Sequence, residues 1–225
     1  MSENISHNLS IKLYDFVAND SVIDNNEDNS IKFNNAYKCN KEFTVQMFGI
    51  SSMGRTASIN VKNYTPFFYV KVDDTFNESI KNEFIAELKK IMGIYYEESI
   101  VKAIITEKHD LYGFDDNKEY KFLLIQFKNI GALNKAKKIF YKETIEDGVY
   151  DKKLLKEGYC FRNIHMFLYE AQIPPLLKLF HIKEIAPSGW IILPSTKTHK
   201  STNRKTYAYY EMEINYKDII SKPEK

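Results

Sequence analysis

The sequence predicts an α+β fold, in which an RRM/ferredoxin-like βαββαβ unit packs with an antiparallel, OB-like or barrel-like β subdomain. Three observations lead to this prediction. The middle third runs through strand, helix, strand, strand and helix in order. Both flanks show the two-residue alternation of half-buried strands. The 225 residues, 44% of them hydrophobic, suffice for one large domain or two small ones.

Strand-like runs in the N-terminal third flank one polar stretch. These runs are residues 10–17, 43–50 and 57–61. In the second run Phe43, Val45 and Met47 alternate with polar side chains, which is the period of a half-buried strand. A short turn separates the second and third runs, so we expect a hairpin. Residues 19–35 are rich in Asn and Asp and indicate an exposed loop.

The middle of the chain predicts the βαββαβ unit. Its segments, in order, are a strand at 67–72, a helix at 79–92, strands at 100–106 and 120–127, a helix at about 131–141 and a last strand within 161–169. Apolar residues recur every three or four positions through the first helix, from Ile80 to Ile91, and Gly93 can end it. Such a unit covers one face of its sheet with helices and leaves the other face open, where RRM-like modules stack bases.

The C-terminal segments return to β structure after one more helix. We expect this helix at residues 173–185, because Pro174 and Pro175 lack N–H groups that a helix start does not use. A strand follows at 190–193. Residues 206–216 alternate as a long antiparallel strand, which we expect to pair with the early hairpin.

These segments predict two subdomains in close contact. The β-rich, OB-like subdomain comprises residues 1–62 and 186–225, and the RRM/ferredoxin-like subdomain comprises residues 63–185. The second subdomain is therefore inserted between strands of the first.

Composition and charge exclude several classes of protein. Lys and Arg number 32 against 30 Asp and Glu, and a net charge of +2 excludes binding to nucleic acid mainly through bulk charge while permitting a local basic strip. Two cysteines, Cys39 and Cys160, make neither a disulfide framework nor a zinc site, so an intracellular location is the default. Residues 1–9 lack an apolar core, and no stretch approaches the roughly 20 apolar residues of a membrane span. We expect no signal peptide and no membrane partner.

No arrangement of residues predicts an active site. The phosphate-binding Gly-x-x-x-x-Gly-Lys motif and the zinc-binding His-Glu-x-x-His motif are missing. Acidic pairs occur at Asp73–Asp74, Glu97–Glu98 and Asp115–Asp116, in loops or at strand ends, where solvated carboxylates are the ordinary expectation. Cys160 and His165 are close in sequence, yet a buried thiol beside a satisfied imidazole explains them better than a nucleophile and its base. We expect no catalytic residue, metal ligand or cofactor in this chain.

A nucleic-acid contact has more support. The segment 194–205 carries Lys197, Lys200, Arg204 and Lys205 and no acidic residue. It bridges two predicted strands, so we expect an exposed loop that presents donors to phosphates, and the alternative is a solvated hairpin with incidental charge. Phe67 and Tyr169 are the aromatic candidates for contact with bases, although aromatic residues in strands also form core or cross-strand pairs.

Four segments together resemble one protein family. They are Met47-Phe48-Gly49-Ile50, then Thr65-Pro66-Phe67-Phe68-Tyr69-Val70, then Tyr169-Glu170-Ala171-Gln172-Ile173-Pro174 with a helix and Gly189-Trp190 after it, and finally Tyr216-Lys217-Asp218-Ile219-Ile220-Ser221. In this order they resemble the N-terminal domain of delta-type family B DNA polymerases, including those of large DNA viruses. One departure is Pro175, where the family usually has Phe.

The resemblance implies a role in DNA replication. The Asp-Ile-Glu motif of the family's exonuclease and the Asp-Thr-Asp motif of its polymerase site are missing, so we expect the chain to end before the exonuclease domain. It implies a non-catalytic template-binding and scaffolding domain of a DNA-directed DNA polymerase with 3′-5′ exonuclease activity. Its partners would be single-stranded template DNA and the exonuclease and polymerase domains, which hold Mg²⁺. It would act in the nucleus or at a viral replication site in the host cytoplasm.

Two other functions stay open on the sequence. One is a free-standing, RRM-like protein that binds single-stranded nucleic acid without a partner domain. The other is a pure protein-interaction scaffold, which binds no nucleic acid.

Overall fold

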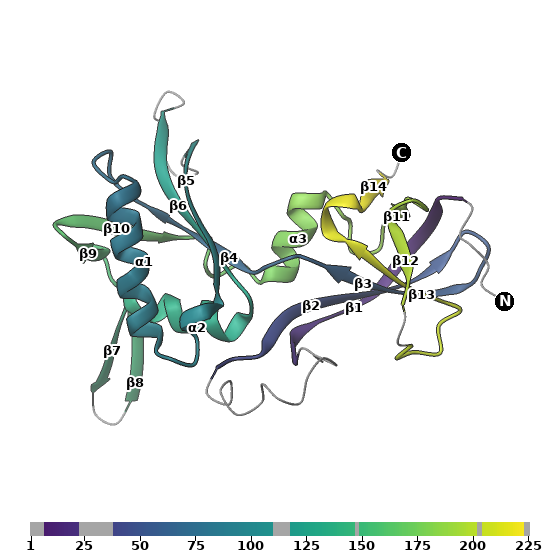
Figure 1. Ribbon diagram of the computed structural model, residues 1–225, viewed down its shortest axis with the longest axis horizontal. Coiled ribbons are helices and arrows are strands. Elements are labelled where there is room, and N and C mark those ends of the chain that lie inside the picture. Colours follow the sequence, from purple (N-terminus) through teal and green to yellow (C-terminus); the bar gives the residue numbers. More distant parts are fainter. Residues whose placement is uncertain (1–6, 23–37, 110–117, 147–148, 202–203, 223–225) are drawn as a thin grey trace, which may run out of the picture. The chain divides into compact units, whose positions relative to one another are not determined.

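The computed structural model describes residues 7–22, 38–109, 118–146, 149–201 and 204–222. The described chain is an α+β protein, mostly of β structure with three α-helices, which confirms the predicted class (Figure 1). It folds into two compact units. The first comprises Met1–Ser21, Phe43–Tyr64 and Ile173–Lys225, and the second comprises Val22–Glu42 and Thr65–Gln172. No helix in the described ranges is long and apolar enough to cross a membrane.

The described strands of the first unit form one seven-stranded sheet. In sheet order they are β12 (Thr198–Lys200), β13 (Tyr210–Asn215), β3 (Thr56–Lys62), β2 (Lys41–Ser51), β1 (Leu9–Val22), β11 (Trp190–Leu193) and β14 (Ile220–Lys222). The predicted hairpin is β2 and β3, where Val45 lies opposite Val61 and Met47 opposite Ile59. All four side chains are buried, as the two-residue alternation requires.

Two expectations about the C-terminal strand are wrong. β13 starts at Tyr210 rather than at residue 206, and it runs parallel to β3, with Met212 opposite Ile59. Alternation predicts which side chains share a face, but it is the same for parallel and antiparallel neighbours, so the direction was not determined by the pattern. The expected loop at 194–205 also contains a short strand, β12, which pairs antiparallel with β13.

The third helix, α3 (Pro175–Lys183), belongs to the first unit. The Phe16 and Phe180 rings lie 4.7 Å apart between centroids, and the Tyr64 hydroxyl donates to the Pro175 carbonyl at 2.8 Å. The helix is shorter than expected because Glu184 takes a left-handed conformation that ends it. The division predicted at residue 186 therefore differs from the observed units, which place α3 with the β-rich strands.

The second unit is built on a five-stranded sheet with helices on one face. In sheet order its strands are β5 (Ile100–His109), β6 (Glu119–Phe127), β4 (Phe67–Lys71), β10 (Ile164–Tyr169) and β9 (Tyr159–Phe161). Each paired neighbour in this sheet is antiparallel. Helices α1 (Glu78–Met92) and α2 (Ile130–Lys137) contribute Phe84, Leu88 and Leu133 to the same buried cluster as Phe68 and Val70 of β4.

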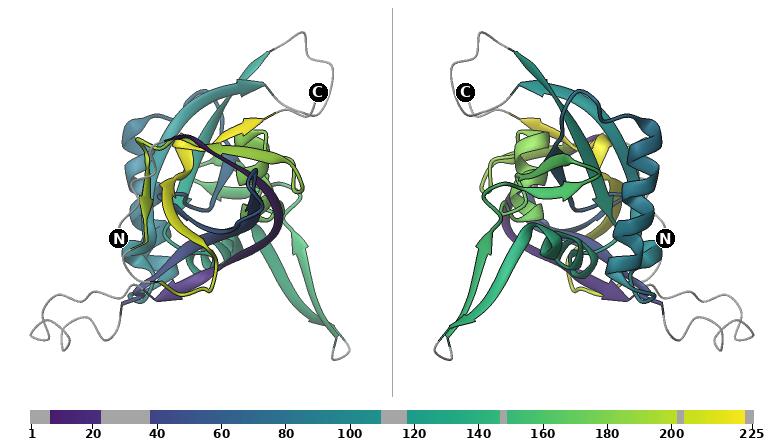
Figure 2. Two further views of the ribbon diagram at one scale, coloured as in Figure 1. Left: turned by 90° about the vertical axis from the view of Figure 1, so that its right-hand side faces the viewer. Right: turned by 90° about the vertical axis from the view of Figure 1, so that its left-hand side faces the viewer.

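Short elements complete both units. They are the 3₁₀ turns η1 (Glu97–Ser99) and η2 (Lys138–Phe140) in the second unit, η3 (Tyr216–Asp218) in the first, and a hairpin of β7 (Tyr141–Glu146) and β8 (Val149–Leu154). The hairpin extends away from the rest of the second unit (Figure 2). It falls between α2 and β9, where the sequence predicted no strand.

Asparagine caps start both helices of the second unit. The Asn77 side chain accepts from the N–H groups of Ser79 and Ile80 at 3.0 and 3.1 Å. The Asn129 side chain accepts from Ala132 N–H at 2.7 Å and, although buried, donates to the Lys41 carbonyl at 2.9 Å. Such caps satisfy N–H groups that have no partner within the helix, and they typically stabilise by ~1 kcal/mol each.

Candidate nucleic-acid interface

The sheet of the second unit has one face turned away from the helices. Phe68 and Val70 of β4 face the helical layer, so Phe67, Tyr69 and Lys71 project from the opposite, open face. The register places residues of neighbouring strands on the same face by pairing Lys71 with Phe122 and Tyr69 with Tyr169. The open face is therefore defined by side chains from β4, β5, β6 and β10.

Aromatic rings form a connected group on the open face. Tyr69 lies 6.3 Å from Phe122 between ring centroids, and Phe122 lies 5.3 Å from Tyr169. Both contacts are edge-to-face, the arrangement that aromatic quadrupoles favour. Tyr69 and Tyr169 are half-buried, so each keeps ring surface that is not covered by protein.

Lysine ammonium groups lie over two tyrosines of the open face, Tyr69 and Tyr120. Lys71 Nζ is 3.5 Å from the centroid of the Tyr120 ring, and Lys108 Nζ is 4.1 Å from that of Tyr69. Lys118 Nζ lies 5.1 Å from the Tyr120 centroid. Each contact is a cation–π pair, worth roughly 0.5–1 kcal/mol at exposed sites. Aromatic faces with adjacent cations combine the two chemistries that hold single-stranded nucleic acid, base stacking and phosphate contact.

The two aromatic residues predicted from the sequence differ in their suitability. Tyr169 lies on the open face at the end of β10. Phe67 is only 8% exposed and packs edge-to-face on Tyr69, with centroids 5.6 Å apart. Phe67 thus supports Tyr69 and has little surface of its own to offer a base.

The predicted basic loop lies in the first unit, and the structure holds it around one carboxylate. Glu211 of β13 is 6% exposed, and it accepts from Lys205 N–H at 2.7 Å and from Thr206 N–H and Oγ1 at 3.0 and 2.9 Å. Arg204 Nε is 3.9 Å from the same carboxylate. Burial by itself raises the pKa of Glu211, but these hydrogen bonds and the Arg204 charge outweigh it and hold the pKa below its ordinary value.

The four basic residues of the loop are therefore in different situations. Lys197 is exposed in the turn after β11, and Lys200 is exposed at the end of β12. Arg204 is engaged by Glu211 and donates from Nη2 to the Ala208 carbonyl at 2.5 Å. Lys205 has an exposed side chain and is fixed through its backbone. The structure brings Arg204 and Lys205 together around Glu211, and Lys197 and Lys200 lie before this turn.

The acidic pairs have structural contacts where they are described. Asp73 Oδ1 accepts from Thr75 N–H at 2.9 Å, which closes the turn after β4. Lys38 hydrogen-bonds Glu98 and lowers the pKa of its carboxyl. Asp115–Asp116 lies outside the described residues. Among the described residues, no group of three or more His, Cys, Asp or Glu side chains is placed to hold a metal ion.

The Cys160–His165 pair also differs from expectation. The two residues lie opposite each other in the β9–β10 pair. Cys160 is exposed, so the expected buried thiol is wrong: β9 is a sheet edge, and its outward residue meets solvent. His165 Nδ1 donates to the Glu157 carbonyl at 2.7 Å, which gives the ring a structural partner.

The sequence alone did not indicate the lysines of the open face as binding residues. Lys71, Lys108 and Lys118 belong to strands β4 and β5 or precede β6, and none was proposed as a binding residue. A signal was present, because Phe67, Tyr69 and Lys71 alternate with buried residues and so had to share a face. Which lysine meets which tyrosine depends on strand order, which the alternation does not contain.

The chain is similar in sequence to DNA polymerases. It is 46% identical over 212 residues to a DNA polymerase of Phaeocystis pouchetii virus, covering 93% of this chain and 20% of that protein. It is 28% identical over 184 residues to the DNA polymerase delta catalytic subunit of Schizosaccharomyces pombe, covering 80% and 16%. No protein-family model matches the sequence.

A solved structure shares the fold. The family B DNA polymerase from the hyperthermophilic archaeon Pyrobaculum calidifontis matches with a TM-score of 0.54 at 14% identity, over 95% of this chain and 21% of that one. The chain thus spans about a fifth of the length of the viral DNA polymerase and of this archaeal polymerase.

Proposed function

This chain belongs to the viral and delta-type family B DNA polymerases, whose N-terminal region it matches, and on that premise we propose that it serves DNA replication as a non-catalytic, template-binding domain. Its ligand is single-stranded template DNA, held by the open face of the second unit. The exonuclease and polymerase domains of the same enzyme are its partners. Mg²⁺ acts in those domains, at the nuclear or viral replication site.

The observation that carries the proposal is the lysine–tyrosine arrangement of the open face. Lys71 and Lys108 sit over tyrosine rings at 3.5 and 4.1 Å, so cationic charge and stacking surface occur together. The strand order β5-β6-β4-β10, with both helices on one face, is the order of an RRM/ferredoxin-like βαββαβ unit and supports that assignment. Modules of this type stack bases on the face opposite their helices.

The basic loop of the first unit is a second contact in this proposal. Lys197 and Lys200 present exposed ammonium groups. Arg204 contributes less, because the charge of Glu211 offsets its own. We therefore expect the open face to dominate binding and the loop to add a smaller, non-specific attraction to phosphates.

A salt-titrated binding measurement tests the proposal. Fluorescence anisotropy with a labelled oligodeoxythymidylate would compare the unaltered chain with Lys71→Glu/Lys108→Glu and with Lys200→Glu/Arg204→Glu. Each lost phosphate contact lowers the slope of log K against log salt concentration by about 0.7 for single strands. We expect Lys71→Glu/Lys108→Glu to lower this slope by more than about 1, and Lys200→Glu/Arg204→Glu to lower it by less.

Lys89→Glu/Lys90→Glu is the matched control, since these exposed lysines lie on α1, in the helical layer that covers the opposite face of the sheet. The control carries the same change in net charge as the open-face pair. Equal losses in the control and the open-face variant would refute a site on the open face and leave only bulk attraction.

A further inference from the structure

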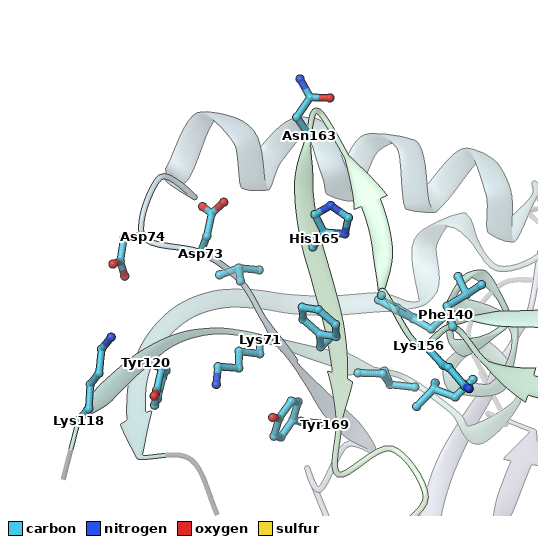
Figure 3. A pocket seen from close by; sticks show the side chains of 16 residues that line it. Lys71, Asp73, Asp74, Lys118, Tyr120, Phe140, Lys156, Asn163, His165 and Tyr169 are labelled. Atoms are coloured by element: carbon cyan, nitrogen blue, oxygen red, sulfur yellow. The ribbon is translucent and has the colours of Figure 1, made fainter. Parts of the chain in front are cut away.

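A cavity of about 860 Å³ opens at one end of the open face, within the second unit (Figure 3). It is lined by residues of β4 and β10, with walls from the turn after β4, the start of β6 and the turn after β8. Its volume falls in the range of small-molecule sites, which span about 300–1,000 Å³. The cavity therefore has room for one nucleotide.

One wall of the cavity is a row of side chains on β10. His165 and Tyr169 of this strand line the cavity (Figure 3). Phe167 also lines it, and it lies between them in the two-residue repeat of the strand. Phe167 is 38% exposed, so part of its ring surface faces the cavity rather than other side chains. An apolar ring that stays accessible inside a cavity is suited to stack on a planar ligand.

Lysine side chains also line the cavity, and the Lys71 ammonium lies 3.5 Å from the centroid of the Tyr120 ring, another lining residue. The register of β4 and β10 pairs Lys71 directly with Phe167, and such opposed residues have Cβ atoms about 4.5–5.5 Å apart. Lys118 and Lys156 also line the cavity. Three lysines outnumber the two lining aspartates, and Asp73 is already engaged with Thr75. The lining thus favours an anionic ligand.

The cavity is held open by contacts in the free chain. Gly158 has φ of +74°, and a Cβ there would meet the Met166 carbonyl oxygen at 2.6 Å, so the turn after β8 packs closely against β10. On the opposite rim, Lys121 Nζ donates to the Asp74 carbonyl at 2.7 Å. A site formed before binding loses less entropy when the ligand arrives.

We propose that this cavity binds a single unstacked nucleotide, with the base against Phe167 and the 5′-phosphate at Lys71 and Lys118. The ring supplies stacking that tolerates any base, and the lysines supply charge for the phosphate. The inference deepens the proposed function, on which it rests, by naming the part of the open face that separates one base from its neighbours. The nucleotide can come from a strand or from a free mononucleotide.

Titration of the whole chain with mononucleotides tests the ligand class. Calorimetry would compare deoxyadenosine 5′-monophosphate with deoxyribose 5-phosphate, which lacks the base. Amide chemical shifts of residues 163–169 would locate the site. We expect the nucleotide to bind at least about tenfold more tightly than the sugar phosphate, because stacking adds to the phosphate contact. Equal binding of the two, or shifts confined to other residues, would overturn the proposal.

Substitution of Phe167 separates stacking from apolar contact. Phe167→Leu keeps an apolar side chain but removes the ring. We therefore expect it to weaken nucleotide binding about tenfold and to leave binding of the sugar phosphate unchanged. Phe167→Tyr keeps the ring and should bind like the unaltered chain. Tyr207→Ala is the control, because Tyr207 is a fully exposed aromatic residue of the first unit and lies outside the cavity.

A pentanucleotide distinguishes a nucleotide within a strand from a free mononucleotide. It also separates the proposal for the cavity from the proposed template role. If it binds with salt dependence but ignores Phe167→Leu, the template role survives and the nucleotide cavity is refuted. If the mononucleotide binds at residues 163–169 and the pentanucleotide does not, the cavity is supported as a site for free nucleotides and the template role fails. If neither binds, both are overturned.

Discussion

Replacing Glu211 with glutamine should destabilise the first unit and loosen the basic loop. The carboxylate is buried and accepts three hydrogen bonds, from Lys205 N–H and from the N–H and hydroxyl of Thr206. Glutamine has nearly the same shape but only one acceptor oxygen, and its amide N–H₂ would face a backbone N–H. At least one donor is left without a partner in Glu211→Gln.

The expected cost follows from these contacts. A hydrogen bond to a charged group contributes about 1.5–3 kcal/mol, and an unsatisfied buried donor carries a penalty of similar size. The glutamine oxygen keeps the most hydrogen bonds in the position of Oε2, which accepts twice from Thr206, so the Lys205 N–H is the one donor that loses its partner. We expect Glu211→Gln to lower the free energy of unfolding by about 2 kcal/mol at neutral pH.

The effect should depend on pH with a definite sign. The pKa of Glu211 is lowered in the folded chain, so its carboxylate stabilises the folded state above the unfolded pKa. That stabilisation disappears as the pH falls through the folded value. The unaltered chain therefore loses stability from about pH 4.5 downwards, whereas Glu211→Gln lacks this contribution. The difference in free energy of unfolding between the two chains narrows as the pH falls.

Urea unfolding followed by tryptophan fluorescence measures this gap. Trp190 is the single tryptophan of the chain and lies in β11, so the signal reports the first unit. Glu213→Gln is the control: Glu213 is on the same strand, and its ion pair with Lys62 at 3.2 Å is partly exposed and worth at most ~1 kcal/mol. A Glu211→Gln variant no less stable than the control, or a difference in unfolding free energy that does not narrow as the pH falls below the ordinary Glu pKa, would refute the reasoning.

Three further predictions concern the second unit. Gly158→Ala should cost about 1–3 kcal/mol, because the positive φ and the close β10 carbonyl oppose a Cβ, whereas Gly93→Ala, with positive φ but open space, should cost about 1 kcal/mol in the same thermal unfolding assay. Asn129→Ala removes a helix cap and a buried donor together, and circular dichroism should show a loss of about 2 kcal/mol. Burial and a hydrogen bond to Glu87 raise the pKa of Tyr159 to about 12, so its contribution to stability is complete below pH 10 and lost as the pH rises towards 12. Absorbance at alkaline pH should show one late-ionising phenol fewer in Tyr159→Phe.

Local pattern was a sufficient guide to most helices and strands. The alternation of Phe43, Val45 and Met47 predicted a half-buried strand, and these three side chains are buried on β2. The helical spacing from Ile80 and the stop at Gly93 predicted α1 within one residue at each end. Both predictions depend only on neighbours within a few positions along the chain, which is the range over which sequence periodicity acts.

Local pattern does not determine the direction of a strand or the strand with which it pairs. Residues 206–216 alternate as predicted from 210 onwards, but β13 runs parallel to β3, and residues 204–206 turn around Glu211 instead of extending the strand. The hairpin β7–β8 was missed because its residues carry no strong alternation of apolar and polar side chains. The conformation of these segments was determined by pairing between strands that are distant in the sequence and by the buried Glu211 carboxylate.

The sequence by itself determined the class of the fold, the family and the strands on which the candidate site is built, because periodicity and family motifs are both properties of short segments. Tertiary structure alone decided the site. Lys71 and Phe167 are far apart in the chain and lie opposite each other only because β4 and β10 are neighbours in register, and Phe67 is only 8% exposed in the folded chain, where its ring packs on Tyr69. A binding surface depends on distances between segments that are far apart in the sequence, and those distances are set when the strands pair into the sheet.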